Sequence, residues 1–231
     1  ALATLPLFRK LSLRHFVVAR LRPNDSWQDQ SVTVVIPCRN EQGNIEEVVN
    51  RLPKLGTHTQ VIFVEGHSDD NTWSEIIRVI GLNPSMDIKA IQQSGVGKGN
   101  AVREGFQKAK GDVLMILDAD LTVAPEDLPK FYAEIASGRG EYINGSRLVY
   151  SMESEAMRFL NYLANRSFAS IFSFLLNQSF SDTLCGTKVI GRKHYEKLVG
   201  GRPYFGDFDP FGDFDLIFGA TKLNLKISEV P

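Results

Sequence analysis

The chain alternates short strand-like runs with helical patterns, and this alternation most constrains what it can fold into. We expect strands at 32–36, 60–64, 88–91 and 113–117, each but the last followed by a helical pattern before the next strand. Short apolar runs bounded by turn residues are typical of strands covered on both faces. Strands that alternate with helices indicate parallel connections. We therefore predict an α/β fold, with a mostly parallel wound sheet flanked by helices.

The fourth apolar run ends in Asp118 and Asp120, two carboxylates separated by one alanine. Leaving neighbouring anionic groups unpaired is costly, because they repel each other and lose hydration. A divalent cation or a cluster of lysine and arginine side chains is the usual partner. In an open α/β sheet, the carboxyl ends of strands are also where ligands bind. The alternative for a bare Asp-x-Asp pair is a surface salt bridge or a helix cap.

Polar residues also follow the first two expected strands. Pro37 is expected to stop the first strand, and Arg39 and Glu41 follow in the loop, where they can meet a ligand or simply open a helix. Glu65 directly follows the second strand and is the better ligand candidate there, whereas residues 69–71 suit helix caps.

A glycine-rich segment, 95–101, opens the helix before the fourth strand. Such a loop lets backbone N–H groups and Lys98 approach a phosphate at a helix start. It is not a Walker loop, because Gln92 occupies the place of the first glycine and Gly99 that of the Ser or Thr. A flexible turn with a solvated lysine is the alternative.

Composition narrows the class of protein further. The 231 residues carry 26 basic and 27 acidic side chains, so bulk charge does not suggest a nucleic-acid partner. Two cysteines argue against a disulfide framework, and no run approaches the roughly 18 apolar residues of a membrane span. We expect a cytoplasmic protein. Because the chain begins at Ala1 rather than Met, we also expect it to be a trimmed or processed piece.

Residues 1–30 are expected to form a basic and apolar appendage, either a helix packed on its own domain or a segment on a membrane surface. Residues 31–231 are expected to form the domain proper. Its second half should contain helices at 125–136, 154–176 and 213–222 and strands at 142–147, 189–190 and 225–228. The apolar second half of the helix at 154–176 must be buried in protein or lie against lipid. The acidic segment 205–215 fails as an EF-hand loop, because phenylalanines occupy ligand positions.

From Val32 to Pro231 the chain resembles glycosyltransferase family 2, which has the nucleotide-sugar-binding GT-A fold. Within it, the closest resemblance is to polyprenol-phosphate hexosyltransferases, the dolichol-phosphate mannose and glucose synthases. The family's motifs occur in its order, at 36–41, 97–99, 118–120, 145–147, 182–188, 213–215 and 229–231. Two departures stand out. Gly66 replaces an acid beside the family's base-contacting acid, which leaves the nucleotide open, and Thr187 replaces a phenylalanine.

The resemblance implies an inverting, metal-dependent hexosyltransferase whose domain, 31–231, is catalytic. Asp120, with Asp118 directly or through water, would hold Mg²⁺ or Mn²⁺ on the diphosphate of GDP-mannose or UDP-glucose. Lys98 would offset charge on the leaving diphosphate. The base and ribose would be lined by Pro37, Arg39, Glu41, Glu65 and Ser68.

The acceptor decides the remaining roles. A polyprenyl or dolichyl phosphate is already an anion and would be placed by Arg147, with Arg158 or Lys188, while the apolar helix half would face lipid at the cytoplasmic side of a membrane. A saccharide hydroxyl would need a base, and Asp213 or Asp182 is the candidate. A catalytically silent nucleotide-sugar-binding module, supported by the Glu65-Gly66 turn, and a nucleotidyltransferase are the alternatives.

Overall fold

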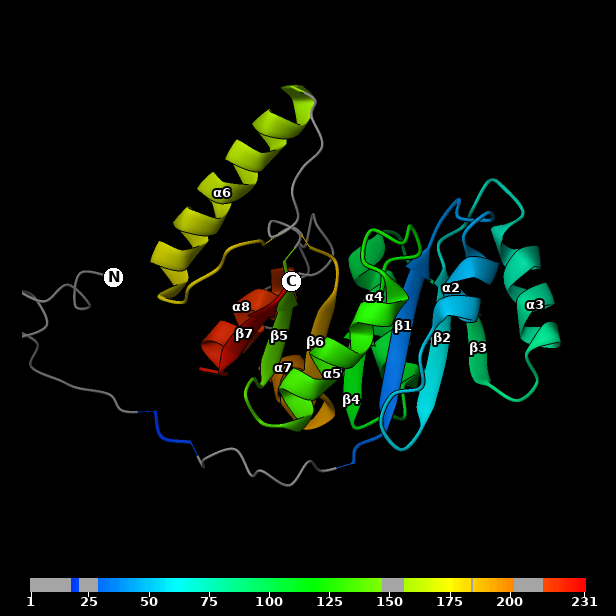
Figure 1. Ribbon diagram of the computed structural model, residues 1–231, viewed down its shortest axis with the longest axis horizontal. Coiled ribbons are helices and arrows are strands. Elements are labelled where there is room, and N and C mark those ends of the chain that lie inside the picture. Colours follow the sequence, from blue (N-terminus) through cyan, green and yellow to red (C-terminus); the bar gives the residue numbers. More distant parts are fainter. Residues whose placement is uncertain (1–17, 21–28, 147–155, 184, 202–213) are drawn as a thin grey trace, which may run out of the picture.

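A computed structural model describes residues 18–20, 29–146, 156–183, 185–201 and 214–231, with the backbone alone for 156–165. These residues form a seven-stranded sheet in the order β3-β2-β1-β4-β6-β5-β7, flanked by helices (Figure 1). The predicted α/β class with a mostly parallel wound sheet is therefore confirmed.

The first four strands make a parallel half-sheet. They are β1 (Val32–Cys38), β2 (Thr59–Glu65), β3 (Asp87–Gln92) and β4 (Val113–Ile116). β1 lies at its centre and pairs in parallel with both β2 and β4. The carboxyl ends of β1, β2 and β4 therefore meet at one edge, as the sequence predicted.

The second half of the sheet contains β5 (Tyr142–Gly145), β6 (Lys188–Gly191) and β7 (Ile227–Val230). β6 runs antiparallel to both β4 and β5, whereas β5 and β7 are parallel. Because β6 is reversed, its amino end lies at the edge where β4 ends. The segment that leads into β6 is thereby brought beside the carboxylates that follow β4.

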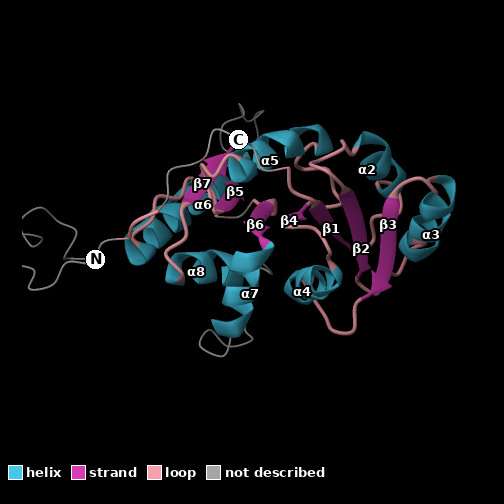
Figure 2. Ribbon diagram, turned by 90° about the horizontal axis from the view of Figure 1, so that it is seen from below, coloured by secondary structure: helices cyan, strands magenta, loops and turns pink. Residues whose placement is uncertain are grey.

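Helices cover both faces of the sheet (Figure 2). One face carries α2 (Ile45–Arg51) and α5 (Leu128–Ala136), with a 3₁₀ turn at Pro125–Asp127, and α3 (Thr72–Leu82) lies beside β3. The other face carries α4 (Lys98–Lys108), α7 (Arg192–Gly201) and α8 (Phe214–Lys222). Alternate residues of β1 enter separate cores: Val34 packs in the first and Val35 in the second.

The structure corrects several predicted boundaries. Pro37 does not stop β1 but pairs within it, opposite Val64. Successive residues of a strand direct their backbone N–H and C=O groups to opposite sides. The carbonyl of Val35 accepts a hydrogen bond on the β4 side and that of Cys38 accepts one on the β2 side, so the nitrogen of Pro37 faces β4. The β1–β4 ladder has already ended at Val35, and a proline is tolerated there.

Other boundaries moved for local reasons. The helix predicted to reach Leu55 ends at Arg51, since Pro53 forces the preceding residue, Leu52, into an extended conformation. The expected strand at 225–228 is shifted to Ile227–Val230, and α7 was not predicted at all. Its composition, with charged residues and two terminal glycines, gives a weak helical pattern.

In the long helix α6 (Ala156–Leu176), the side chains that the structure describes, those of 166–176, are covered on one side only. Phe172 packs on Phe214 and Phe218 of α8, with ring centroids 5.3 and 5.6 Å away. Phe168, Ile171, Phe174 and Leu175 are 48–65% exposed. The apolar half of this helix was predicted to be buried in protein or to lie against lipid, and burial in protein accounts for one of its faces. No helix in the described part of the chain is both long and apolar enough to cross a bilayer.

Candidate active site

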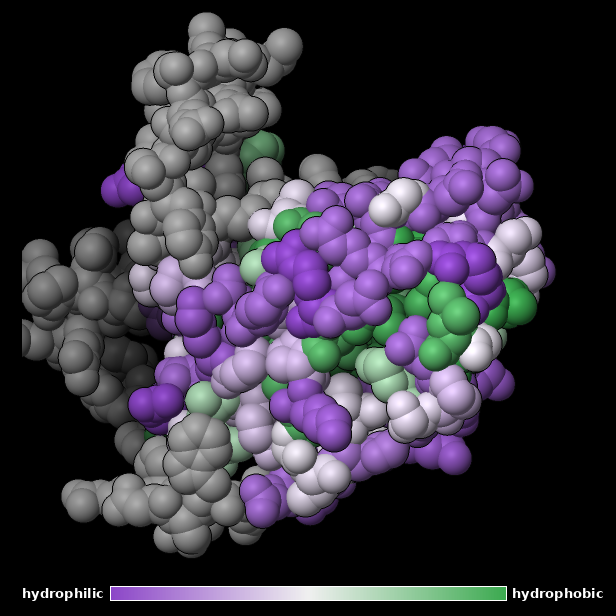
Figure 3. All heavy atoms as spheres, turned by 45° about the vertical axis from the view of Figure 1, so that its right-hand side comes forward, coloured by the Kyte–Doolittle hydropathy of each residue, from purple (hydrophilic) through white to green (hydrophobic). Residues whose placement is uncertain are grey.

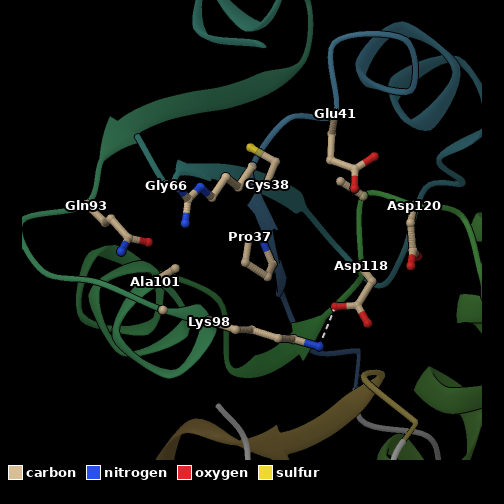
Figure 4. A pocket seen from close by; sticks show the side chains of 12 residues that line it. Pro37, Cys38, Glu41, Gly66, Gln93, Lys98, Ala101, Asp118 and Asp120 are labelled. Atoms are coloured by element: carbon tan, nitrogen blue, oxygen red, sulfur yellow. Dashed lines mark ion pairs between the residues drawn. The ribbon is translucent and has the colours of Figure 1, made fainter. Parts of the chain in front are cut away.

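A cavity of about 290 Å³ opens where β1, β2 and β4 end. Its lining includes six residues predicted from the sequence: Pro37, Arg39, Glu41, Lys98, Asp118 and Asp120. Figure 4 shows Glu41, Lys98, Asp118 and Asp120 toward one end and Gln93 and Gly66 at the other. The alternation of strands and helices thus does bring these separated polar residues together.

At the charged end, Lys98 and Asp118 form an ion pair, with 2.6 Å between Nζ and Oδ1 (Figure 4). Both side chains are partly exposed, at 31% and 23%. Lys98 is the first residue of α4, and Gly97 before it has φ +87°, a conformation that favours glycine. The positive end of the helix dipole and the ammonium therefore reach the same cavity, which suits an anionic ligand.

The two carboxylates fit a hard divalent cation. Asp118 and Asp120 both line the cavity, and Asp120 Oδ1 also accepts the backbone N–H of Thr122 at 3.0 Å. Within the described ranges, no group of three or more His, Cys, Asp or Glu side chains could hold a metal. Mg²⁺ is commonly held by one or two carboxylates together with substrate phosphates and water. The chain would thus supply part of a coordination shell that a diphosphate completes.

Glu65 and Ser68 brace the loops instead of lining the cavity. Glu65 is 1% exposed, and its carboxylate accepts the backbone N–H of Ser68 at 2.6 Å. Burial acts to raise the pKa of Glu65, but the hydrogen bonds from Ser68, Gln92 and the backbone of His67 together outweigh it and hold the pKa below its usual value. Ser68 Oγ in turn accepts the N–H of Asn40 at 3.0 Å. These contacts tie the loop after β1 to the loop after β2.

Of the six further lining residues, Gly97, Ala101 and Ala119 lie within the predicted glycine-rich segment and carboxylate pair, whereas Cys38, Gly66 and Gln93 were missed as site candidates. Gly66 lies against Arg39 and Gln93, because a Cβ there would be 3.4 Å from Arg39 Cβ and from Gln93 Oε1. Gln93 is 4% exposed and donates to the carbonyl of Gly95 at 2.8 Å. Gln93 directly follows β3, so the same rule that selected residues after β1 and β2 could have found it.

Asp182 and Lys188 do not face the cavity, since both are fully buried. Asp182 Oδ1 accepts the backbone N–H of Cys185 at 3.1 Å, and Lys188 Nζ donates to the carbonyl of the same residue. Their predicted contact with an acceptor is therefore not seen in this conformation. Arg147 and Asp213 lie outside the described residues, and Arg158 is on α6 where the structure describes the backbone alone.

A wound α/β sheet with a carboxylate pair and a helix start at one ligand cavity is the arrangement of the GT-A class of nucleotide-sugar-binding proteins. The family model described as "Glycosyl transferase family 2" matches residues 33–199. The chain therefore belongs to glycosyltransferase family 2, as its motifs suggested.

Two curated relatives have names that specify lipid phosphates. A dolichol-phosphate mannosyltransferase of Pyrococcus furiosus is 33% identical over 137 residues, covering 58% of this chain and 38% of the relative. An undecaprenyl-phosphate 4-deoxy-4-formamido-L-arabinose transferase of Shewanella sediminis is 28% identical over 140 residues, covering 58% and 41%. The matched regions thus span about two fifths of each relative.

Solved structures share the fold at low sequence identity. Mannosyltransferase PcManGT from Pyrobaculum calidifontis, in complex with GDP-Man and Mn²⁺, has a TM-score of 0.60 and 20% identity, covering 96% of this chain and 59% of that one. Glucosyl-3-phosphoglycerate synthase from Mycobacterium tuberculosis, in complex with Mn²⁺, UDP and glucosyl-3-phosphoglycerate, has a TM-score of 0.62 and 19% identity, covering 87% of this chain and 69% of that one.

Proposed function

We propose that this chain transfers a hexose from a nucleotide-sugar, with inversion, in a reaction that depends on Mg²⁺ or Mn²⁺. One observation carries the proposal: Lys98, Asp118 and Asp120 meet in a single cavity at the carboxyl ends of the central strands. Family membership supports it, as do the GDP-Man and UDP complexes with Mn²⁺ among the structural neighbours. GDP-mannose and UDP-glucose are the donors we would test first.

Lys98, Asp118 and Asp120 would act at the leaving diphosphate. Asp118 and Asp120 would hold the cation, which when bound offsets the negative charge that grows as the glycosidic bond breaks. Lys98 would leave Asp118 for the diphosphate, where its ammonium and the start of α4 stabilise the same charge. Arg39 and Glu41 would bind the base and ribose, with Pro37 beneath them; Glu65 and Ser68 would shape these loops from behind.

A polyprenyl phosphate is the acceptor that we favour. The names of both curated relatives contain a lipid phosphate. The exposed apolar face of α6, comprising Phe168, Ile171, Phe174 and Leu175, suits contact with its hydrocarbon chain and with the surface of a membrane. The acceptor phosphate needs positioning rather than a base, and Arg147 and Arg158 are the proposed cations. A saccharide hydroxyl would instead require a base such as Asp213.

A transfer assay tests the proposal directly. The full chain is incubated with Mn²⁺, radiolabelled GDP-mannose or UDP-glucose, and a polyprenyl phosphate, and the butanol-extractable label is counted. Asp120→Asn should lower the rate by at least about 100-fold, because the diphosphate loses stabilisation of its developing charge. Asp127→Asn is the matched control, since Asp127 pairs with Lys130 on α5 and is absent from the cavity lining.

Other outcomes of the assay would identify one of the alternative functions. Label transferred to a water-soluble saccharide would replace the lipid acceptor by a hydroxyl acceptor. Tight nucleotide binding with no transfer to any acceptor would favour the silent binding module. Pyrophosphate released from a sugar phosphate and a nucleoside triphosphate would identify a nucleotidyltransferase. Unchanged activity of Asp120→Asn would refute the metal role of that residue.

A further inference from the structure

The loop before β6 places a glycine directly against the charged end of the cavity. A Cβ built on Gly186 would lie 1.8 Å from Asp118 Oδ2 and 2.5 Å from Lys98 Nζ, closer than real Cβ contacts come. Asp118 follows β4, and Lys98 opens α4, so three separate segments meet at one point. The backbone of Gly186 therefore packs directly against both charged side chains.

A buried polar network fixes the residue before Gly186. The carboxylate of Asp182 accepts the N–H of Cys185, and the ammonium of Lys188 donates to its carbonyl. All three residues are fully buried. Buried charges that are engaged in this way rigidify the segment they hold, because releasing either one would leave it desolvated. The peptide groups that lead into Gly186 are thus restrained at both the donor and the acceptor.

The start of the loop is anchored in the sheet. Glu229 of β7 accepts the N–H of Ser181 at 2.9 Å and the side-chain amide of Asn144, on β5, at 3.1 Å. β5 and β7 pair in parallel beside β6. The loop is consequently tied to three strands of the second half of the sheet, while its glycine contacts residues of the first half.

We propose that Gly186 is a positioning residue for donor binding, which rests on the proposed function above. Its backbone holds the carboxylate of Asp118 in the orientation that a cation requires, and it keeps the ammonium of Lys98 at the cavity, within reach of a diphosphate. A carboxylate that is fixed before binding needs no reorganisation when the cation arrives. Asp182 and Lys188 act through this loop and do not themselves touch the substrate.

The nature of the contacts separates this role from a role in folding. The atoms that an alanine at position 186 would meet are the far ends of two side chains, which can swing aside while the backbone stays in place. Gly111 gives the opposite case, because a Cβ there would lie 2.5 Å from the backbone N of Thr33 and from the backbone C of Val32. Gly111 precedes β4, at the end of the strand opposite to Asp118.

The test compares Gly186→Ala with Gly111→Ala in the full chain. Thermal unfolding reports stability, and Mn²⁺ electron paramagnetic resonance with GDP or UDP present reports binding. We expect Gly186→Ala to unfold near the wild-type temperature while its affinity for the Mn²⁺–nucleotide falls by about tenfold or more, as for other residues that orient metal ligands. Gly111→Ala should unfold earlier, yet its folded fraction should bind within about twofold of wild type.

A second variant covers the case in which Gly186→Ala fails to fold. Lys188→Met has similar length and adds no bulk at the cavity, but it releases the carbonyl of Cys185. It should also weaken Mn²⁺–nucleotide binding, whereas a residue that binds only the acceptor would leave donor binding unchanged. A crystal structure of Gly186→Ala should show the carboxylate of Asp118 and the ammonium of Lys98 displaced.

The readouts separate failure of this inference from failure of the proposed function. If wild type binds the Mn²⁺–nucleotide and both variants bind equally well, the positioning role is overturned. If wild type binds neither nucleotide with Mn²⁺, the proposed function fails. In that case the crystal structure of Gly186→Ala by itself tests the positioning role. If it shows the Asp118–Lys98 pair in its wild-type position, the positioning role is overturned.

Discussion

Cys38 shows how the cavity controls the chemistry of a single side chain. It lines the cavity but is only 4% exposed, and its Sγ lies 3.6 Å from the carbonyl of Val64. Burial, followed by the negative charge of Glu65, raises the pKa of the Cys38 thiol to about 12. At neutral pH the group is therefore a protonated, weakly polar lining residue and not a thiolate nucleophile.

This pKa predicts a loss of stability at alkaline pH. The thiol ionises near pH 9 in the unfolded chain but near 12 in the folded one, so between these values the folded state binds more protons. Stability must then fall as pH rises, by at most about 1.4 kcal/mol per pH unit from this group. Urea unfolding of wild type and Cys38→Ala between pH 8 and 10.5 measures it. The variant should show a shallower slope, and parallel slopes would contradict the prediction.

Sequence reasoning located the site residues that depend on strand ends and missed those that depend on burial. Asp118 and Arg39 were found because the carboxyl ends of parallel strands share an edge, and Lys98 because a glycine-rich segment opens its helix. Burial depends on how the antiparallel β6 returns beside β4, which no local pattern reveals. Asp182 and Lys188, chosen as polar residues of a motif, therefore turned out to be enclosed in the protein.

At the scale of elements, the strands and helices with a strong hydrophobic pattern were predicted well, whereas a helix with a weak pattern was not. β1, β2 and α3 are buried on the faces that their apolar residues indicated. α7 escaped because a charged, glycine-ended segment has little helical signal of its own and gains its stability from Tyr195 and Leu198 packing in the core. Tertiary contacts, which a sequence pattern does not contain, decide such elements.

The position of α4 depends on one small residue. Gly105 faces the sheet, where a Cβ would lie 2.4 Å from Val35 Cγ1 and 3.1 Å from Val64 Cγ2. Valine side chains are stiff, so Gly105→Ala should push α4 outward and lower the free energy of unfolding by about 1–3 kcal/mol. Because Lys98 opens the same helix, donor binding should weaken as well. Urea denaturation and nucleotide titration measure the two effects.

The control for this substitution is Gly81→Ala, in the last turn of α3, where nothing lies within 4 Å of the added methyl group. It should leave donor binding unchanged and stabilise the protein by up to about 1 kcal/mol, since alanine is a better helix former than glycine. A Gly105→Ala protein as stable as wild type would show that α4 is not held close to the sheet by this contact.

At the scale of the whole molecule, exposed apolar side chains occur on α6 and on α3, at opposite ends of the sheet, as well as at Val18, Val96 and Val199. α6 stands beside α8 at one end, and α3 lies at the other (Figure 1). The view in Figure 3 brings the α3 side forward and shows a largely hydrophilic surface with a smaller hydrophobic area. Ile77 and Leu82 of α3 are 49% and 60% exposed, so exposed apolar residues alone do not distinguish α6.

What distinguishes α6 is that Phe168, Ile171, Phe174 and Leu175 lie on one face of the helix, next to Phe172, which packs on α8. We therefore predict that Phe174→Ser combined with Leu175→Ser reduces binding to phosphatidylcholine vesicles that contain a polyprenyl phosphate by at least about tenfold, measured by cosedimentation. Both side chains are more than 60% exposed, so folding and nucleotide binding should be unaffected. Ile77→Ser with Leu82→Ser, on α3, removes a comparable apolar area and should bind vesicles like wild type. An equal loss in both double variants would indicate nonspecific adsorption, and no loss in the α6 variant would move the membrane contact elsewhere in the chain.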